Sequence, residues 1–464
     1  MSLLYALPGI LEESRIEYEI AKSSDYTLKE IFSPQGSSVV WQAGNPEVSN
    51  ILAGGDNLAF MKYLMENRNL QGKFQLIYID PPFFSQADYG TKMEFASGAE
   101  TTKVKGKAYS DTWETGMEGY LKMLCVRFFA IRDLLAEEGC LWVHLDWHGV
   151  HYVKILLDGI FGENNFVNEV IWQYKSGGTS KRHFARKHDT LLFYSKSNAY
   201  YFNPQKEKSY NRGMKPYRFK GVKEYEDLVG WHTLVNMKDV WQIDMVGRTA
   251  RERTGYATQK PEALLERIIE SCSKPGDLCG DFFCGSGTFA AAAEKLKRNW
   301  ICCDKGNLAV IHTLSRLAQN HASFERYEDI VKKRSVADCH DILVDVKISK
   351  MNETEDFVEI ELVEFKPEMI GIAEMSSKDQ NTVERLLHED SLQLIEYWSV
   401  DFNYDGVAHR AREPFFKRGQ RVVAKDRSLI SDSNAISLSL VDSFGRSYHK
   451  VISLQRGAED EKNQ

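Results

Sequence analysis

The chain has 464 residues, of which 43% are hydrophobic, so it is long enough for about three domains with sizeable cores. Nothing in it approaches the roughly 18 consecutive apolar residues of a membrane span, and the N-terminal residues turn acidic too soon for a signal peptide, so we expect a cytoplasmic protein that has no membrane contact. The formal net charge of −7 argues against a nucleic-acid partner, and eight cysteines without a C-x-x-C pair favour free buried thiols over disulfides or a metal site.

The first segments predict an arm followed by a strand, a turn and a helix. Residues 1–50 form the arm, with a polar helix near Glu12–Ala21 and a short strand at Ser38–Trp41. The next stretch, Ile51–Leu70, contains an apolar strand end, a Gly-Gly-Asp turn and an amphipathic helix. Asp56 therefore lies between a strand and a helix, which is where open α/β sheets bind ligands. An N-cap for the helix is an equally compatible role.

A stiff turn follows the next predicted strand. Leu76–Ile79 is a short apolar run typical of a strand buried on both faces. Pro81 and Pro82 fix the backbone and remove two donors, so the carboxylate of Asp80 and free carbonyls can point out of the strand end. With the ring of Phe83, they suit a flat group that carries an exocyclic amine. A proline-rich strand exit with a chance acid is the alternative.

Alternating helices and strands continue after this turn. Residues 84–113 lack periodicity over about thirty positions, so we expect a long loop that orders over a ligand. A helix at Gly119–Glu138, a buried strand at Cys140–Asp146 and a helix at Gly149–Phe161 come next. This alternation predicts an α/β fold with a doubly wound, mostly parallel sheet.

The turn at Asp80, Pro81, Pro82 and Phe83 resembles the catalytic motif of the amino-methyltransferases, which move a methyl group from S-adenosylmethionine to the exocyclic nitrogen of adenine or cytosine. Asp is usual in N6-adenine enzymes, whereas N4-cytosine enzymes more often have Ser. The run His144–Trp172 also resembles type III modification subunits of the bacterial DNA methyltransferases. His144, Asp146, His148 and His151 in this run have no recognised metal-ligand spacing, and we expect no metal.

Basic residues concentrate between residues 172 and 254. This segment has 17 Lys+Arg against 8 Asp+Glu, a local net charge of +9 in an acidic chain. Interleaved aromatic residues make it suited to following phosphates and touching bases, and the resemblance implies a target-recognition insert here. We expect double-stranded DNA as the partner, with phosphate contacts from Lys181, Arg182, Arg186 and Lys187. A solvated lysine-rich insertion is the alternative.

The segment Thr254–Ile269 begins with Thr-Gln-Lys-Pro and ends in an amphipathic helix that Pro261 opens. The helix pattern explains the end of the segment but not its start. The resemblance implies that this start lies beside the cofactor, which makes Lys260 a partner for the cofactor carboxylate. A solvent-facing lysine at a helix N-terminus is the alternative.

A second turn predicts the rest of the cofactor site. Asp281 and Phe283 end a strand, Gly285, Ser286 and Gly287 turn tightly, and Thr288 opens a strong helix former whose free amides favour an anion. Asp304 ends the following strand, where a carboxylate suits the two hydroxyls of a ribose. A dinucleotide-binding oxidoreductase also fits this pattern, with Ala290 at the third small position, but it leaves the Asp-Pro-Pro-Phe turn unexplained.

The order of these motifs resembles the permuted β class of amino-methyltransferases, because the catalytic turn precedes the cofactor turn. We therefore expect a catalytic half at 51–171, the recognition insert at 172–254, a cofactor half at 255–344 and a β-rich accessory domain at 345–464. The two halves must meet in one pocket. The accessory domain begins with 16 acids and 5 bases between residues 345 and 405, which favours partner docking over DNA wrapping.

The resulting prediction is a DNA methyltransferase that acts on the N6 amine of adenine with S-adenosylmethionine as cofactor. Two alternatives stay open: an N4-cytosine enzyme, and a non-catalytic DNA-binding subunit of a restriction or defence assembly. A restriction or defence-system subunit and a second copy of the chain are the further partners expected.

Overall fold

A computed structural model gives the fold. It describes residues 3–32, 50–97, 100–178, 180–256, 258–329, 342–352, 355–367, 376–411, 413–417, 421–431 and 433–454. The strand expected at Ser38–Trp41 and the eighth cysteine, Cys339, lie outside these residues. The other seven cysteines are free and buried. None of the helices in the described ranges has the length and apolar content to cross a membrane.

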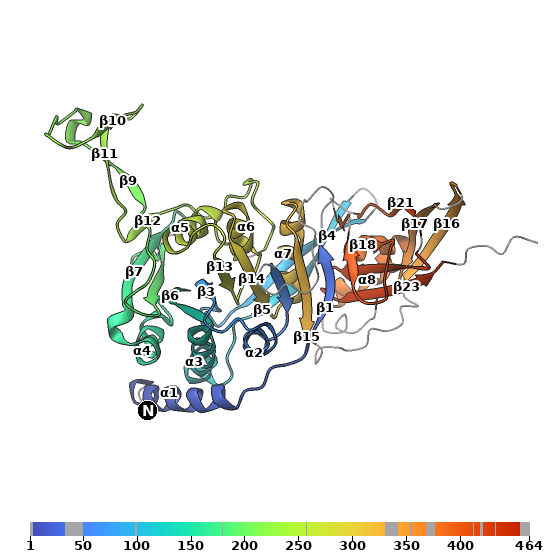
Figure 1. The fold of residues 1–464 in the computed structure, drawn as a ribbon, viewed down its shortest axis with the longest axis horizontal. Helices are drawn as coiled ribbons and strands as arrows, with labels where there is room; N and C mark the ends of the chain where they lie inside the picture. Colours follow the sequence, from blue (N-terminus) through green and yellow to red (C-terminus); the bar gives the residue numbers. More distant parts are fainter. Residues whose placement is uncertain are drawn as a thin grey trace, which may run out of the picture.

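A large central sheet organises the molecule (Figure 1). Neighbouring strands pair in parallel, except that β8 is antiparallel to both its neighbours and β1 is antiparallel to β15. The predicted mostly parallel α/β sheet is confirmed. In spatial order the strands are β12 (Val240–Gln242), β7 (Phe166–Gln173), β8 (His188–Ser195), β6 (Leu135–Leu145), β3 (Phe74–Ile79), β13 (Leu278–Asp281), β14 (Asn299–Asp304), β2 (Ile51–Gly54), β15 (Phe324–Asp329), β1 (Tyr26–Phe32) and β19 (His409–Ala411).

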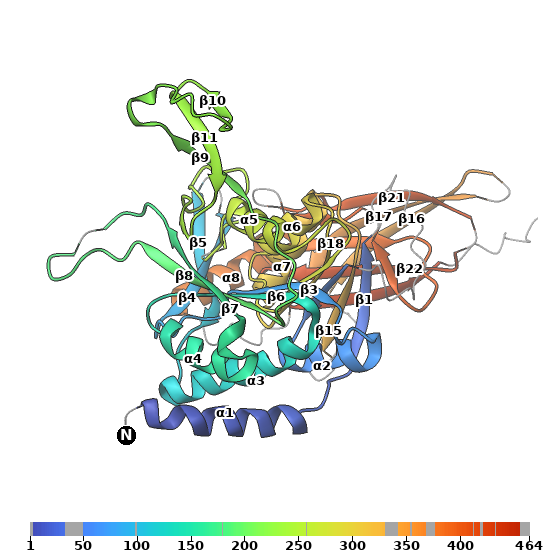
Figure 2. The ribbon, with the colours of Figure 1, turned by 60° about the vertical axis from the view of Figure 1, so that its left-hand side comes forward.

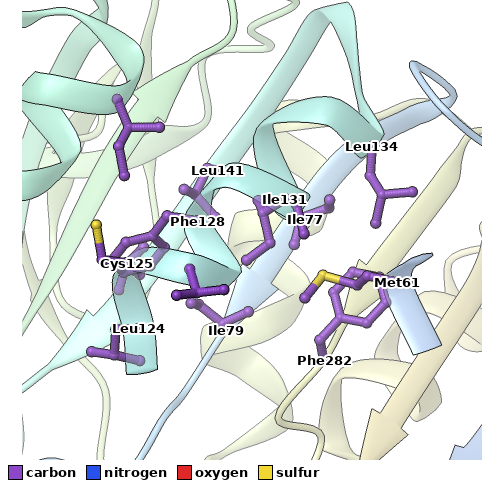
Figure 3. Close-up of a cluster of buried hydrophobic side chains, with 14 of the residues drawn as sticks. Met61, Ile77, Ile79, Leu124, Cys125, Phe128, Ile131, Leu134, Leu141 and Phe282 are labelled. Carbon is purple, nitrogen blue, oxygen red and sulfur yellow. The ribbon is translucent and has the colours of Figure 1, made fainter. Parts of the chain in front are cut away.

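Helices cover both faces of this sheet, as its apolar strands require. In β3, Ile77 and Ile79 face one core and Leu76 and Tyr78 face the other. Figure 3 shows Ile77, Ile79 and Leu141 packed against side chains of α3. The first face carries α1 (Leu3–Ile20), α2 (Asn57–Arg68), α3 (Gly116–Leu134) and α4 (Val150–Phe161), with the 3-10 turn η1 (Glu163–Asn165). The second carries α5 (Glu262–Cys272), α6 (Thr288–Lys295) and α7 (Asn307–Gln319).

A narrow arm projects from the sheet beyond β8 (Figures 1 and 2). It is built from β9 (Lys206–Tyr210), η2 (Arg212–Met214), β10 (Glu224–Glu226) and β11 (Trp231–Asn236). The chain enters and leaves at one place, because Met237 N donates to Gln205 O over 2.9 Å. Within the range 172–254 expected for the insert, β8 and β12 belong to the central sheet, whereas β9, β10 and β11 form a separate sheet in the arm.

The C-terminal residues form a β-rich domain, as expected. Strand β19 joins this domain to the central sheet by pairing with β1. The domain comprises β16 (Ile342–Lys350), β17 (Asp356–Phe365), α8 (Ser377–Glu389), η5 (Ser391–Leu394), β18 (Ile395–Asp401), β20 (Phe415–Phe416), β21 (Lys425–Ile430), β22 (Ala435–Asp442) and β23 (Ser447–Ser453).

Three predictions about elements were wrong in detail. The loop expected at 84–113 contains a long hairpin of β4 (Asp88–Ser97) and β5 (Glu100–Ser110). Phe95 and Val104 of this hairpin pack into the C-terminal core, so it is not a free lid. The helix expected at Gly119–Glu138 ends at Leu134, where β6 begins, and the N-terminal helix starts at Leu3 rather than near Glu12.

Candidate functional site

The two carboxylate oxygens of Asp80, in the turn after β3, have different surroundings. Asp80 Oδ2 accepts a hydrogen bond from Lys260 Nζ, which arrives from the segment before α5. Asp80 Oδ1 is buried and has no hydrogen-bond partner among the described residues. A buried carboxylate oxygen without a donor is costly. The turn therefore offers an acceptor that a bound amine can satisfy.

The backbone immediately after the turn is strained and clamped. Phe84 has φ 64° and Gln86 has φ 56°, a region that residues other than glycine rarely occupy. Asp111 holds this segment: its side chain accepts from Phe84 N at 3.1 Å, from Ser85 N at 2.6 Å and from Trp113 Nε1 at 3.0 Å. Asp111 thus fixes the exit of the turn, and no sequence motif had indicated it.

A buried series of hydrogen bonds runs beneath the turn at residues 80–83. His144 Nδ1 lies 2.9 Å from the Tyr78 hydroxyl, and Nε2 lies 3.2 Å from Asp189 Oδ2. A neutral imidazole that donates from Nε2 to the carboxylate accepts from the tyrosine at Nδ1. Burial alone would raise the pKa of Asp189, but the hydrogen bond from His144, the charge of Lys260 and the hydrogen bond from Tyr174 hold it below its usual value. The Tyr174 hydroxyl donates to Asp189 Oδ1 at 3.0 Å and extends the series.

This series of hydrogen bonds ends close to the side chains of Asp80 and Phe83. His144 Nδ1 is 4.0 Å from Asp80 Oδ1, and its ring centroid is 5.7 Å from that of Phe83. The sequence pattern assigned no role in the site to His144, because its spacing to the nearby histidine and aspartate residues is not that of metal ligands. Its position at the end of β6, beside β3, was the only signal for this role.

The glycine turn after β13 faces the catalytic turn, because β13 pairs directly with β3. Gly285 and Gly287 have φ 51° and 70°, and a Cβ on Gly287 would lie 2.6 Å from Thr313 Cγ2. Asp304 accepts from Gly285 N at 2.9 Å through Oδ2 and from Gly306 N at 2.8 Å through Oδ1. Its carboxylate thus draws the glycine turn and the end of β14 together.

Asp281 is 2% exposed at the end of β13. Burial raises the pKa of Asp281 well above its usual range, and the nearby charges of Asp80 and Asp304 raise it further, although Phe283 N donates to its Oδ1 at 3.0 Å. The carboxyl groups make this end of the cavity acidic, which favours a cationic ligand.

Asp56 is the N-cap of α2 and also lies at the wall of the cavity. It caps α2 by accepting from Leu58 N and Ala59 N, and it lines the cavity. Arg127 donates to Asp56 Oδ2 at 2.9 Å and to Asn57 Oδ1 at 2.5 Å, which fixes this wall. Arg127 comes from the middle of α3, where the helical pattern gave no sign of a polar role.

One cavity of about 560 Å³ unites the two predicted halves of the site, a volume in the range of small-molecule pockets. Gly287 is not among the lining residues, but it lies between two that are. Of the predicted residues, the cavity is lined by Asp80, Pro81, Pro82, Phe83, Asp56, Lys260, Asp281, Phe283, Gly285, Ser286, Thr288 and Asp304.

The predicted DNA contacts lie outside this cavity, on the loop between β7 and β8. Lys181, Arg182 and Arg186 are exposed. Lys187 turns back and donates to Ser176 Oγ at 2.8 Å and Gly177 O at 2.6 Å, so it braces the loop. None of these four residues lines the cavity that contains the turn at residues 80–83.

Comparison with known proteins identifies related chains. A family model described as DNA methylase, N6_N4_Mtase, matches residues 74–311, which is half of the chain. The type II methyltransferase M.EcaI of Enterobacter cloacae is 27% identical over 332 residues, which cover 59% of this chain and 70% of the relative. The type II methyltransferase M1.MboII of Moraxella bovis is 36% identical over 157 residues, 30% of this chain and 57% of the relative.

Two solved structures are also similar. The M1.HpyAVI–SAM complex is 19% identical with a TM-score of 0.37, covering 57% of this chain and 98% of that one. The PvuII DNA methyltransferase, described as cytosine-N4-specific, is 16% identical with a TM-score of 0.40, covering 58% of this chain and 86% of that one.

Proposed function

The chain belongs to the N6_N4_Mtase family of DNA methylases, and from this premise we propose that it transfers a methyl group from S-adenosylmethionine to the N6 amine of adenine in DNA. The observation that carries the proposal is the buried, unpartnered Oδ1 of Asp80 in the cavity that also contains the glycine turn. The resemblance of Asp-Pro-Pro-Phe to the N6-adenine motif supports adenine as the target.

The cavity suits this cofactor. S-adenosylmethionine supplies an electrophilic methyl group on a positively charged sulfur. The carboxyl groups of Asp80, Asp281 and Asp304 line the cavity that would receive this charge. The close backbone of Gly285 leaves room for the ligand, and Asp304 lies at a strand end suited to a ribose. In this proposal Lys260 exchanges Asp80 for the cofactor carboxylate, which frees Asp80 for the substrate.

The residues of the catalytic turn act on the target base. The base is extruded from the duplex and stacks on Phe83. Asp80 and the Pro81 carbonyl accept the two amine hydrogens, which localises the nitrogen lone pair towards the methyl group. As the N–C bond forms and the S–C bond breaks, the nitrogen becomes positive, and Asp80 stabilises that charge and takes the surplus proton.

The test is to incubate the purified chain and S-adenosylmethionine with plasmid DNA and to map modified bases by sequencing. We expect N6-methyladenine at one sequence motif. N4-methylcytosine instead would establish the cytosine alternative. An absence of modified bases, with no cofactor binding by calorimetry, would establish the non-catalytic alternative.

Asp80→Asn is the matched control, because it preserves size and removes the charge. We expect it to bind S-adenosylmethionine and to lose methyl transfer by roughly 10²-fold or more, the usual cost of one transition-state contact. Transfer at the normal rate would remove Asp80 from the mechanism.

Several finer predictions remain. We also propose that residues 144–172 are similar to type III modification subunits. The proposal further includes a restriction or defence-system partner, a homodimer and a cytoplasmic location. The relatives reported above are named type II methyltransferases.

A further inference from the structure

The loop between β7 and β8 carries an aromatic side chain that the proposed reaction has not used. We name its described residues, 174–178 and 180–187, the basic loop. Its strands end beside the catalytic turn: Gln173 pairs with His188, and two residues on, Thr190 pairs with Leu145 at the end of β6. Strand β6 in turn pairs in parallel with β3, which ends at Ile79. Figure 2 shows the loop between β7 and β8 extending away from the helices.

Phe184 is 98% exposed on this loop. Its neighbours Lys181, Arg182, His183 and Arg186 are exposed as well. A phenyl ring left wholly in water forfeits the favourable burial that such a side chain normally gains. An aromatic ring among cations is the combination with which proteins grip phosphates and insert an apolar wedge between base steps.

Contacts of Arg186 and Lys187 hold the base of the basic loop near the end of β6. The guanidinium of Arg186 stacks 3.7 Å above the ring of Trp147, two residues beyond the end of β6. At the base of the loop, Tyr174 N donates to Lys187 O over 3.1 Å. The Tyr174 hydroxyl bonds Asp189, which continues to His144 beneath Asp80. The loop and the catalytic turn therefore share one buried support.

We infer that Phe184 is the residue that enters the DNA base stack where the target base leaves it. This inference rests on the proposed function. Phe83 stacks on the extruded base inside the cavity, and Phe184 fills the space left in the duplex, while Lys181 and Arg182 neutralise flanking phosphates. Without the ring, the extruded state loses its substitute stacking partner, and the target base returns to the helix more often.

The experiment compares two duplexes that contain the methylated motif mapped above. In one the target base is normally paired, and in the other it faces an abasic site, so that extrusion is already easy. Single-turnover methylation is measured for the full chain and for Phe184→Ala. We expect a roughly ten- to hundredfold loss on the paired duplex and less than about a twofold loss on the unpaired one, since stacking on an aromatic ring is the term removed. Phe184→Trp should retain the paired rate.

Lys181→Gln is the control from the same loop, because it removes a phosphate contact and should slow both duplexes equally at limiting DNA. An equal loss for Phe184→Ala on both duplexes, or no loss on the paired one, overturns the role of Phe184 and leaves the proposed function standing. A wild-type protein that methylates neither duplex overturns both.

Discussion

The carboxyl group of Asp281 is shielded from water at the acidic end of the cavity, and its pKa lies well above the usual range. A bound cation favours the ionised form, so binding of the positively charged S-adenosylmethionine should release a proton and tighten as the pH rises. S-adenosylhomocysteine has lost that charge and should not show this dependence. We expect the affinity for S-adenosylmethionine, divided by that for S-adenosylhomocysteine, to rise about five- to tenfold as the pH rises through the pKa of Asp281. Calorimetry at several pH values measures both affinities.

Asp281→Asn provides the control for this prediction. The amide keeps the size of the side chain and cannot ionise, so the ratio of the two affinities should become independent of pH. A ratio that is already flat in the unchanged protein would show that Asp281 does not sense the ligand charge.

The Tyr78 hydroxyl is the second prediction at the scale of one residue. Tyr78→Phe removes the donor to His144 Nδ1 and leaves a buried acceptor unsatisfied. The free energy of unfolding should fall by about 1–3 kcal/mol. Methyl transfer should also slow, because His144 supports Asp80 and Phe83, while the stacking of residue 78 on Phe289 keeps the cavity wall in place.

Tyr120→Phe is the matched control, because the Tyr120 hydroxyl is equally buried and has no hydrogen-bond partner in the described residues. Its removal should be neutral or stabilising in denaturant titrations. If the two substitutions destabilise the protein equally, the series of hydrogen bonds through His144 contributes nothing beyond ordinary packing.

At the scale of one element, the basic loop should determine how DNA binding responds to salt. Each phosphate contact steepens the plot of log affinity against log salt concentration by about 0.9. The double substitution Lys181→Gln and Arg182→Gln should therefore flatten the slope by up to about 1.8. Fluorescence anisotropy of labelled duplex DNA at several salt concentrations measures it.

Lys73→Gln controls for charge alone. Lys73 is exposed just before β3, at the opposite end of this strand from the turn at residues 80–83. It should leave the slope unchanged. A loop variant whose slope equals that of the Lys73 variant would place the phosphate contacts elsewhere.

Elements with a strong local signal were predictable from the sequence, and those whose burial depends on distant partners were not. The apolar run at Leu76–Ile79 and the alanine-rich helix at Thr288 were found because their patterns are local. The hairpin of β4 and β5 was missed because Phe95 and Val104 find their apolar partners in the C-terminal domain, more than two hundred residues later. Strand β8 was also missed, because its apolar run lies within the basic segment 172–254 and the charge pattern directed attention to a surface insert.

Within the site, the sequence indicated residues that stand in motifs. Asp111, from a loop, and Arg127, from a helix, act through several hydrogen bonds to residues that are distant in sequence or not part of a motif, and no spacing rule identifies such residues. Only the three-dimensional position of His144, between Tyr78 and Asp189, distinguishes it from an ordinary core histidine.

At the scale of the whole molecule, a buried ion pair between β1 and β15 of the central sheet also accepts a hydrogen bond from the C-terminal domain. Glu30 is 1% exposed, accepts from Arg326 Nη1 at 2.8 Å and from the Tyr397 hydroxyl at 2.9 Å. Breaking such a pair leaves an uncompensated charge, so Glu30→Gln should lower the free energy of unfolding by about 3–5 kcal/mol in denaturant titrations. Glu361→Gln, whose partner Lys425 is exposed, should lower the free energy of unfolding much less, because surface ion pairs add little stability.

The same pair predicts a pH dependence. Burial would raise the pKa of Glu30, but Arg326 and His409 together hold it below the ordinary value of 4.5. A depressed carboxyl pKa stabilises the folded state fully above pH 4.5, and this stabilisation is lost as the pH falls through the folded-state pKa. Glu30→Gln should remove that part of the acid sensitivity, and an unchanged acid profile would contradict the assignment.

The narrow junction at Gln205 and Met237 has a practical consequence. Because the chain leaves the sheet and returns at hydrogen-bonded neighbours, the segment between them behaves as a cassette with fixed ends. A foreign hairpin of any length that closes on the same two positions can be grafted there without disturbing the methyl-transfer machinery. The arm can therefore be exchanged as one unit while the strands of the central sheet are kept.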